Sequence, residues 1–376
     1  MSATVAQPVR TIVAPTEVLD TPCLVVDEAI LHQNIAEMAA LAKSLGVALR
    51  PHIKTHKTPQ IAKLQLAAGA VGITCAKLGE AEVMAEAGID DILIAYTIVG
   101  DLKIRRLLAL MERARMIVGV DSREGAEALS DAMAAEERVL DVYIEVNTGQ
   151  SRAGALAGEE AARLALDVAR LPGLRVIGAF THEGHAHLVP PEEIETVALA
   201  AGRALVDTAE RIRARGLALP VVSVGSTPAA GITPTVPGVT EMRPGTYVFK
   251  DASVFRYGHF GPDRCAARIL ATVVSHAAPD RAVVDAGSKT LSLDKTPSHP
   301  GHGYIVGHER AVIERLSEEH GVVILPPDDP GLRIGERVEI IPNHICPAVN
   351  LLDDLSIVRD GRVTDVWRIA ARGKVR

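Results

Sequence analysis

Short apolar runs alternate along the first two thirds of the chain with longer segments of helical period. The predicted strands cover residues 23–27, 47–54, 72–76, 91–96, 115–121, 140–147, 175–182 and 221–226, and helical segments such as 28–46, 57–69, 78–88 and 192–216 lie between them. This alternation is typical of βα units and a parallel sheet. At least seven such units in about 230 residues favour a (β/α)8 barrel over a doubly wound sheet. The absence of a GxGxxG motif after the first strand further weakens the doubly wound alternative.

The pattern changes near residue 260. Gly, Pro and Asp turns now separate the apolar runs, and the predicted strands lie within residues 266–277, 280–287, 311–325, 335–342 and 355–373. Such a segment is typical of a compact β domain, and the "RDGR" sequence at 359–362 predicts a hairpin turn. The predicted organisation is a barrel over residues 18–255 and a β domain formed by residues 1–17 plus 256–376.

Composition and charge exclude several classes of function. The formal net charge of the 376 residues is −7, which argues against nucleic acid or an anionic membrane as a partner. No apolar stretch approaches the roughly 18 residues of a membrane span, and the first residues lack the apolar region of a signal peptide. The four cysteines are scattered without CxxC spacing, which is typical of a reducing compartment. We therefore expect a cytoplasmic protein.

Five basic side chains stand within residues 50–59, "RPHIKTHKTP", at the end of the second predicted strand. Strand alternation places His52, Lys54 and His56 on one face and Lys57 beyond the turn. Active sites of barrels lie at the C-terminal ends of the strands. Lys54 is then either a surface or ion-paired lysine or a Schiff-base lysine whose pKa is lowered by burial and neighbouring cations. The basic cluster favours the second interpretation, because an aldehyde cofactor with a phosphate would neutralise it.

Small residues follow the last predicted barrel strand, in "SVGSTPAAG" at 223–231. Gly225, Ser226 and Thr227 offer backbone N–H groups and hydroxyls to a phosphate. The late strands of such barrels often hold phosphate. An ordinary tight turn is the alternative interpretation.

Two further motifs contain candidate ligands or bases. The segment "FTHEGHAH" carries His182, His185 and His187, which suit metal binding or proton transfer, although a polar loop with one useful histidine is the alternative. In "IPNHICPAVNL", His344 and Cys346 are predicted to share one face of an extended segment. Two soft ligands at this spacing suit Zn²⁺. A buried cysteine beside a capping histidine is an equal alternative from the residues alone.

These motifs together resemble the D-serine dehydratase / D-threonine aldolase family. The similarity runs from about residue 18 to 376 and rests on segments 21–35, 50–57, 147–154, 224–227 and 342–351. It implies the alanine racemase fold, in which a TIM-type barrel that binds pyridoxal 5′-phosphate (PLP) is followed by a C-terminal β domain. It also implies that Lys54 carries the PLP, since "PHIK" matches the family's Pro-x-x-Lys strand end.

The resemblance also implies roles for the other candidates. The predicted cofactor-binding residues are Lys54, His52, Arg152, Gly225, Ser226, Thr227 and Tyr247. Arg152 would lie near the phenolic oxygen of the cofactor, with a surface arginine as the alternative, and Tyr247 would contact the phosphate. The predicted catalytic residues are Lys54, His182 and His185.

The resemblance places a divalent metal in the β domain. His344 and Cys346 would hold it, with Zn²⁺ as the first expectation and Mn²⁺ as the second. Asp285, Glu319 and His320 match family motifs and are predicted to be structural or to support the site.

The predicted function is a PLP- and metal-dependent lyase of D-3-hydroxy amino acids, and by analogy a homodimer. A D-serine dehydratase, which releases pyruvate and ammonia, is the first choice, because the family's dehydratases carry His-x-Cys where its aldolases tend to carry His-x-Asp. A D-threonine aldolase, which releases glycine and acetaldehyde, is the alternative. An amino-acid racemase or a non-catalytic PLP-binding protein are further alternatives. A racemase needs a second base, and Tyr304 lacks the expected context, while non-catalytic carriers lack a metal-bearing β domain.

Overall fold

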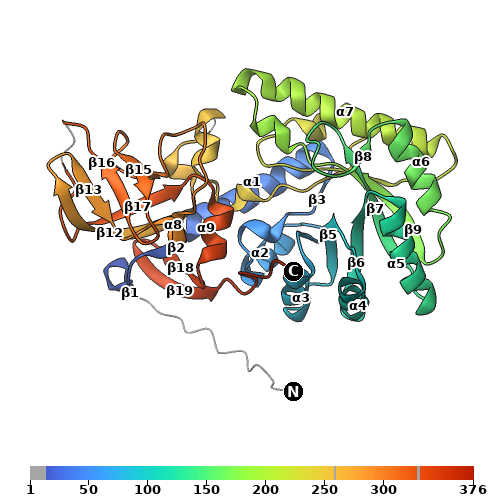
Figure 1. Ribbon diagram of the computed structural model, residues 1–376, viewed down its shortest axis with the longest axis horizontal. Coiled ribbons are helices and arrows are strands. Elements are labelled where there is room, and N and C mark those ends of the chain that lie inside the picture. Colours follow the sequence, from blue (N-terminus) through green and yellow to red (C-terminus); the bar gives the residue numbers. More distant parts are fainter. Residues whose placement is uncertain (1–13, 258–259, 328–330) are drawn as a thin grey trace, which may run out of the picture. The chain divides into compact units, whose positions relative to one another are not determined.

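The computed structural model describes residues 14–257, 260–327 and 331–376 of the chain (Figure 1). These residues form two compact units, each built from several segments of the chain. Unit 1 contains the described part of Met1–Asn34, together with Thr55–Gln60 and Val248–Gly373. Unit 2 contains Ile35–Lys54, Ile61–Tyr247 and Lys374–Arg376. The domain limits predicted from the sequence stay a prediction, and residues 1–13 lie outside the described residues.

Unit 2 is built on a barrel of eight parallel strands. In spatial order they are β3 (Ala48–Leu49), β11 (Glu241–Met242), β10 (Val221–Val224), β9 (Leu174–Phe180), β7 (Leu140–Asn147), β6 (Arg115–Val120), β5 (Asp91–Thr97) and β4 (Ile73–Cys75). A short further strand, β8 (Ala155–Leu156), pairs with β7.

The barrel closes between β3 and β4, the two ends of this order. A parallel bridge joins His52 to Thr74. The Thr74 N–H also donates to the Pro51 carbonyl oxygen at 2.8 Å, and the Val71 N–H donates to that of Leu49 at 2.9 Å. The structure therefore confirms the predicted barrel.

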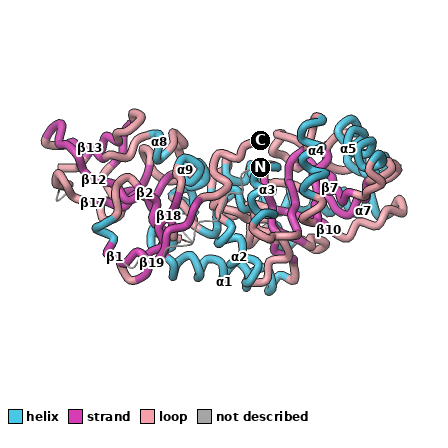
Figure 2. The backbone as a smooth tube through the Cα atoms, turned by 90° about the horizontal axis from the view of Figure 1, so that it is seen from below, coloured by secondary structure: helices cyan, strands magenta, loops and turns pink. Residues whose placement is uncertain are grey.

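Helices cover the outside of the barrel strands (Figures 1 and 2). They are α3 (Leu78–Glu86), α4 (Asp101–Leu110), α5 (Arg123–Ala135), α6 (Glu159–Val168) and α7 (Ile194–Arg213), while α1 (Glu28–Leu45) and α2 (Pro59–Ala67) each have residues in both units. The helices pack through apolar faces of helical period, such as Ala126, Leu129 and Met133 of α5. Within the described ranges, no helix is both long and apolar enough to span a membrane.

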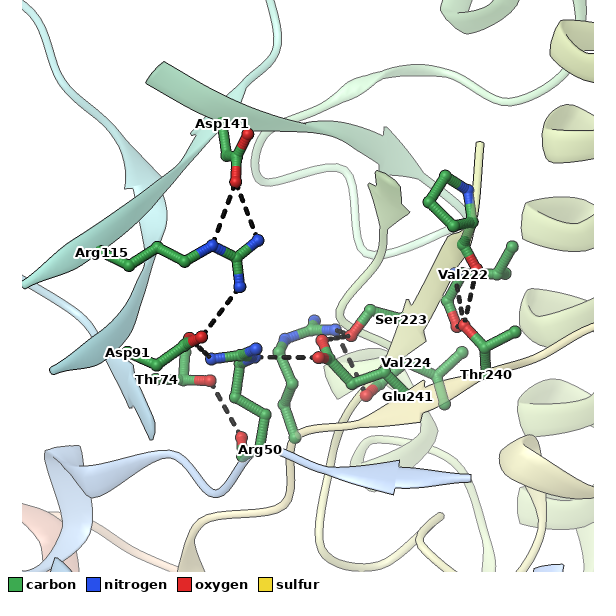
Figure 3. A network of polar contacts seen from close by, with 12 residues as sticks. Arg50, Thr74, Asp91, Arg115, Asp141, Val222, Ser223, Val224, Thr240 and Glu241 are labelled. Carbon is green, nitrogen blue, oxygen red and sulfur yellow. Dashed lines mark hydrogen bonds and ion pairs between the residues drawn. The ribbon is translucent and has the colours of Figure 1, made fainter. Parts of the chain in front are cut away.

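Ion pairs connect several strands of the barrel (Figure 3). Arg115, the first residue of β6, lies 2.8 Å from Asp91 of β5 and 2.8 Å from Asp141 of β7. Arg50, just after β3, pairs with Asp91 and, at 2.8 Å, with Glu241 of β11. Because Arg50 and Glu241 are buried, each needs the other to compensate its lost hydration. The network continues from Glu241 through the Ser223 hydroxyl to Arg243, the residue after β11.

Unit 1 is built on a ten-stranded, mainly antiparallel sheet. Its main path is β1 (Ala14–Pro15), β19 (Arg362–Arg368), β18 (Asp354–Arg359), β2 (Cys23–Asp27), β12 (Ala267–Ala278), β13 (Arg281–Val284), β16 (Gly321–Ile324) and β15 (Val312–Leu316), with β17 (Arg337–Pro342) and β14 (Gly303–Ile305) off this path. Short helices α8 (Ser288–Leu291) and α9 (Ile345–Leu351) lie next to each other (Figure 1).

The predicted hairpin at 359–362 is confirmed, because β18 and β19 pair across it. Its two central residues, Asp360 and Gly361, have φ values of 49° and 70°. Positive φ at both positions matches the twist of the flanking strands.

The strand prediction was wrong at three places. Residues 23–27, expected in the barrel, pair with β12 and β18 of unit 1 as β2. The eighth barrel strand is instead β11, whose two residues are too few to show a periodic pattern. The predicted strand 47–54 ends after Leu49, and Ile53–Thr55 forms a 3-10 helix. His52, Lys54 and His56 therefore do not share one strand face as expected.

Candidate active site

Lys54 lies at the C-terminal end of the barrel. It belongs to the 3-10 helix that follows the His52–Thr74 bridge, and its N–H donates to His52 Nδ1 at 3.3 Å. The Lys54 side chain is half-buried. Lys57, the other lysine of the motif, belongs to unit 1 and is buried there, with a φ of 53°. The structure thus assigns only Lys54 to the barrel unit.

His182 is the second residue after β9, and its Nδ1 lies 2.5 Å from the Gly225 carbonyl oxygen. Because a carbonyl only accepts, Nδ1 carries the proton and Nε2 is left as an acceptor. Burial lowers the pKa of His182 to about 3, and the charges of Lys54, Arg152 and Arg243 act in the same direction. His182 is therefore neutral near pH 7 and lies within the electrostatic reach of Lys54.

The small-residue loop directly follows β10. Gly225 donates its N–H to Glu183 Oε2 at 3.1 Å, and the Thr227 hydroxyl accepts the Tyr247 N–H at 3.1 Å. The backbone N–H groups of Ser226 and Thr227 make no hydrogen bond within the described part of the chain. These two donors fit a phosphate group, and they replace the Gly225 N–H that we had expected in this role.

Glycine is required at position 225 for a different reason from the predicted one. A Cβ atom built on Gly225 would lie 2.8 Å from Arg243 Cβ and 3.1 Å from the Arg243 backbone. The glycine thus permits close approach of the loop to the neighbouring strand end. Arg243 is fully buried and donates to the Thr181 carbonyl oxygen at 2.6 Å, which gives it a structural role.

Tyr247 is suited to a phosphate contact. Its side chain is 1% exposed, and its hydroxyl accepts a hydrogen bond from Gln65 Nε2 at 2.9 Å. The hydroxyl proton is then available to a further acceptor. Burial raises the pKa of Tyr247, so this proton is retained.

Arg152 lies in an exposed loop after β7. The Asn147 side-chain oxygen shapes this loop by accepting the N–H groups of Gly149 at 3.0 Å and Ser151 at 3.1 Å. Burial raises the pKa of Glu145 on β7, and the charge of Arg152 opposes that rise. Arg152 is therefore close enough to the inner strand residues to act on them electrostatically.

His185 packs against the same loop. A Cβ atom on Gly149 would lie 2.7 Å from His185 Nε2, so the imidazole covers this glycine. Burial lowers the pKa of His185, and its Nδ1 is buried without a hydrogen-bond partner among the described residues. A neutral imidazole with an unpaired nitrogen can accept or donate a proton.

His344 and Cys346 lie at the start of helix α9 in unit 1. His344 precedes the first turn and Cys346 is its second residue, so the extended segment that we predicted for them was wrong. The two side chains still interact, since Cys346 acts on the pKa of His344. The Cys346 thiol also donates to the hydroxyl of Thr55, the residue after Lys54, at 3.3 Å.

The surroundings of His344 are acidic. Its Nδ1 lies 2.7 Å from Asp294 Oδ2. Burial alone would lower the pKa of His344, but Cys346, Asp251 and Asp294 raise it to about 10. Asp251 is buried and accepts the Ile345 N–H at 3.0 Å, which holds the first turn of α9 in place.

This donor set fits a divalent metal with two protein ligands. Within the described ranges, no three His, Cys, Asp or Glu side chains form a complete metal-binding group. With Nδ1 held by Asp294, His344 would bind a metal through Nε2, as histidine ligands do when a carboxylate orients them. Cys346 Sγ would be the second ligand, and water or substrate would complete the coordination.

Three residues of uncertain role have structural contacts. Asp285 accepts the Thr21 hydroxyl at 2.6 Å. Glu319 pairs with Lys289 at 2.8 Å, and the His320 carbonyl oxygen accepts a hydrogen bond within the turn between β15 and β16.

Sequence reasoning noted Glu183 in the "FTHEGHAH" motif but assigned it no role. This carboxylate is 1% exposed and contacts the loop after β10. In the sequence Glu183 stands directly after His182 in a polar motif. This position does not distinguish a buried carboxylate from a solvated one.

The fold and the lysine at the C-terminal end of the barrel define an enzyme class built on the alanine racemase fold. Residues 26–253 match the family described as "Alanine racemase, N-terminal domain", and residues 266–358 match "Putative serine dehydratase domain". The chain therefore belongs to the alanine racemase-like family that combines these two domains and includes D-threonine aldolases and D-serine dehydratases.

The relatives of the chain include aldolases as well as dehydratases. A D-threonine aldolase from Arthrobacter sp. is 36% identical over 96% of this chain and 94% of its own. A D-threo-3-hydroxyaspartate dehydratase from Delftia sp. is 35% identical over 87% of this chain and 91% of its own. A D-serine dehydratase from Dictyostelium discoideum is more distant, with 27% identity over 91% of this chain and 94% of its own.

Solved structures agree with the fold. The crystal structure of the D-threonine aldolase from Filomicrobium marinum has a TM-score of 0.92 and 36% identity, and the match covers 98% of this chain and 100% of that one. Structures of a D-threo-3-hydroxyaspartate dehydratase include a cysteine-to-alanine mutant in the metal-free form and a histidine-to-alanine mutant. In that dehydratase the two substituted positions are two residues apart.

Proposed function

We propose that the chain is a PLP- and metal-dependent lyase of D-3-hydroxy amino acids. Dehydration of the D-serine type is the first reaction that we propose, and aldol cleavage of the D-threonine type is the second. Support for PLP comes from the barrel, where Lys54 lies near neutral His182. The N–H groups of Ser226 and Thr227, unpaired within the described residues, and the Tyr247 hydroxyl are suitable donors for its phosphate.

The choice of dehydration rests on one observation. His344 and Cys346 are two residues apart, the spacing of the histidine and cysteine substituted in the dehydratase structures, of which the cysteine mutant is metal-free. A thiolate and an imidazole suit Zn²⁺ better than Mn²⁺, which prefers oxygen ligands. The higher identity to a D-threonine aldolase favours aldol cleavage as the second candidate.

The proposed chemistry assigns a role to each residue. PLP, when bound, supplies an electron sink for charge at the substrate Cα. Lys54 Nζ would hold the cofactor and would be the base that removes the substrate Cα proton. Nε2 of neutral His182 would accept a hydrogen bond, and His185 would be a base for the 3-hydroxyl group in aldol cleavage.

His344 and Cys346 would hold the metal. The chemistry that a bound metal would supply is Lewis acidity toward the 3-hydroxyl group, which helps this group to leave as hydroxide or to lose its proton. Arg152 would donate to the phenolic oxygen of the cofactor without losing its own charge.

Product analysis tests the proposal. The purified protein, loaded with PLP and Zn²⁺, is incubated separately with D-serine, D-threonine, D-threo-3-hydroxyaspartate and D-alanine. We expect ammonia with pyruvate from D-serine or with oxaloacetate from D-threo-3-hydroxyaspartate. Glycine and acetaldehyde from D-threonine, without ammonia from any substrate, would give aldol cleavage first place. Racemised D-alanine without lyase products would refute both reactions, and Lys54→Ala is the inactive control.

Three broader expectations also stay proposals. They are the domain limits 18–255 and 1–17 plus 256–376, a homodimeric state and a cytoplasmic location. Light scattering on the purified protein tests the homodimer directly.

A further inference from the structure

We propose that Glu183 is a positioning residue that orients the phosphate-binding loop from behind. The inference rests on the proposed function, since it concerns how the barrel would hold the phosphate of PLP. Glu183 touches neither Lys54 nor the metal residues in any hydrogen bond of the structure.

The Glu183 carboxylate is buried among donors. Oε2 accepts the Gly225 N–H at 3.1 Å, and Oε1 accepts the hydroxyls of Ser226 at 3.3 Å and Thr233 at 3.4 Å. A carboxylate removed from water needs such donors, because leaving it unpaired in the interior is costly. The three donors therefore show that the surroundings of this side chain are arranged to bind a carboxyl group.

Gly225 is held from both sides by consecutive residues of one motif. Its N–H donates to Glu183, and its carbonyl oxygen accepts from His182 Nδ1. These two hydrogen bonds fix the peptide planes before and after Gly225, which glycine would otherwise rotate freely. These two hydrogen bonds together determine the direction of the N–H groups of the next two residues.

Those next two N–H groups, on Ser226 and Thr227, donate no hydrogen bond within the described part of the chain. Phosphate binding depends on the direction of such N–H groups, because several must point at one anion together. The Gly225 N–H donates to Glu183 and is therefore not available to a phosphate. The same hydrogen bond fixes the orientation of the N–H groups of Ser226 and Thr227. A buried carboxyl group can thus assist anion binding when it lies behind the loop.

The test separates phosphate recognition from general stability. Binding of PLP and of unphosphorylated pyridoxal to the cofactor-free full chain is measured by absorption titration for the original protein and for Glu183→Ala. We expect Glu183→Ala to weaken PLP binding by at least about tenfold, because a buried acceptor of three hydrogen bonds is lost. Pyridoxal binding should change by less than about twofold, because pyridoxal has no phosphate to contact the loop.

Two further variants sharpen the result. In Glu183→Gln the amide oxygen can accept the Gly225 N–H while the amide nitrogen donates to the Ser226 hydroxyl, so PLP affinity should return to within about threefold. Asp141→Asn is the matched control, because Asp141 is also a buried carboxylate but pairs with Arg115 and Arg175 near the N-terminal end of β7. It should leave the ratio of PLP to pyridoxal affinity unchanged.

Each outcome has a defined meaning. Equal loss of PLP and pyridoxal affinity in Glu183→Ala, or no loss of either, overturns the inference. If Glu183→Ala does not fold, Glu183→Asp decides by the same ratio, since its shorter side chain withdraws the acceptor from Gly225 but keeps the carboxyl group. An original protein that binds PLP no better than pyridoxal refutes phosphate recognition itself, and with it the proposed function, independently of any variant.

Discussion

The low pKa of His182 predicts a specific dependence of stability on pH. In the folded protein this pKa is about 3, mainly because the side chain is buried, against an ordinary value of 6.5 for the unfolded chain. Below pH 6.5 the unfolded chain therefore binds a proton at His182 that the folded protein does not bind. Stability from this residue is complete above pH 6.5 and is lost as the pH falls toward 3.

The magnitude follows from these two pKa values. Between pH 7.5 and pH 5 the unfolded histidine becomes almost fully protonated while the folded one stays neutral. The free energy of unfolding should then fall by about 2 kcal/mol through this residue alone, since one pKa unit corresponds to about 1.4 kcal/mol. The variant His182→Asn keeps a donor near the position of Nδ1 for the Gly225 carbonyl oxygen but cannot take up a proton.

Urea unfolding of the cofactor-free protein, followed by circular dichroism at several pH values, measures the effect. The original protein should lose about 2 kcal/mol more than His182→Asn between pH 7.5 and pH 5. All other titrating groups contribute equally to both proteins, so the difference isolates His182. Parallel pH profiles for the two proteins would refute the reasoning, because His182 would then titrate alike in the folded and unfolded chains.

Three further outcomes are expected. Borohydride reduction of the PLP-loaded protein should fix the cofactor on Lys54, and a label mapped to Lys57 would contradict the site. Chelation should abolish lyase activity without removing the visible absorption band of bound PLP, and activity that does not respond to the chelator rejects the metal. Cys346→Asp should release less ammonia relative to glycine than a Cys23→Ser control. Gly225→Val should reduce PLP affinity at least about tenfold because the added carbons collide with the adjacent strand end, and full PLP occupancy would remove the loop from the site.

The barrel could be predicted because its longer strands and helices repeat a regular pattern. Strands such as β7, with eight residues, are long enough for apolar periodicity to show. The two-residue strand β11 has no such signal, and β2 is apolar enough to fit either a barrel or a sheet. Partner strands are determined by contacts distant in the sequence, which a local pattern does not contain.

The candidate site was predictable in its residue types but less so in its geometry. Lys54 was identified from the basic cluster and the family motif, yet the 3-10 helix around it was not expected. His344 and Cys346 were expected on a strand face and lie at a helix start. The role of Glu183 was missed because it depends on burial and on a loop that follows another strand.

The pairing of strand β2 affects the order in which the chain folds during translation. It pairs with β12 and β18, and the hydroxyls of Thr21 and Thr272, next to this pairing, join residues 251 positions apart at 2.7 Å. Translation of that interval takes roughly 10 to 50 s at typical elongation rates. During that time the nascent apolar segment 23–27 has no sheet partner, while the strands from β3 to β11 are already available to pair with one another. We therefore expect the barrel to form first during synthesis, and the N-terminal strand to need protection from aggregation until the end of the chain emerges.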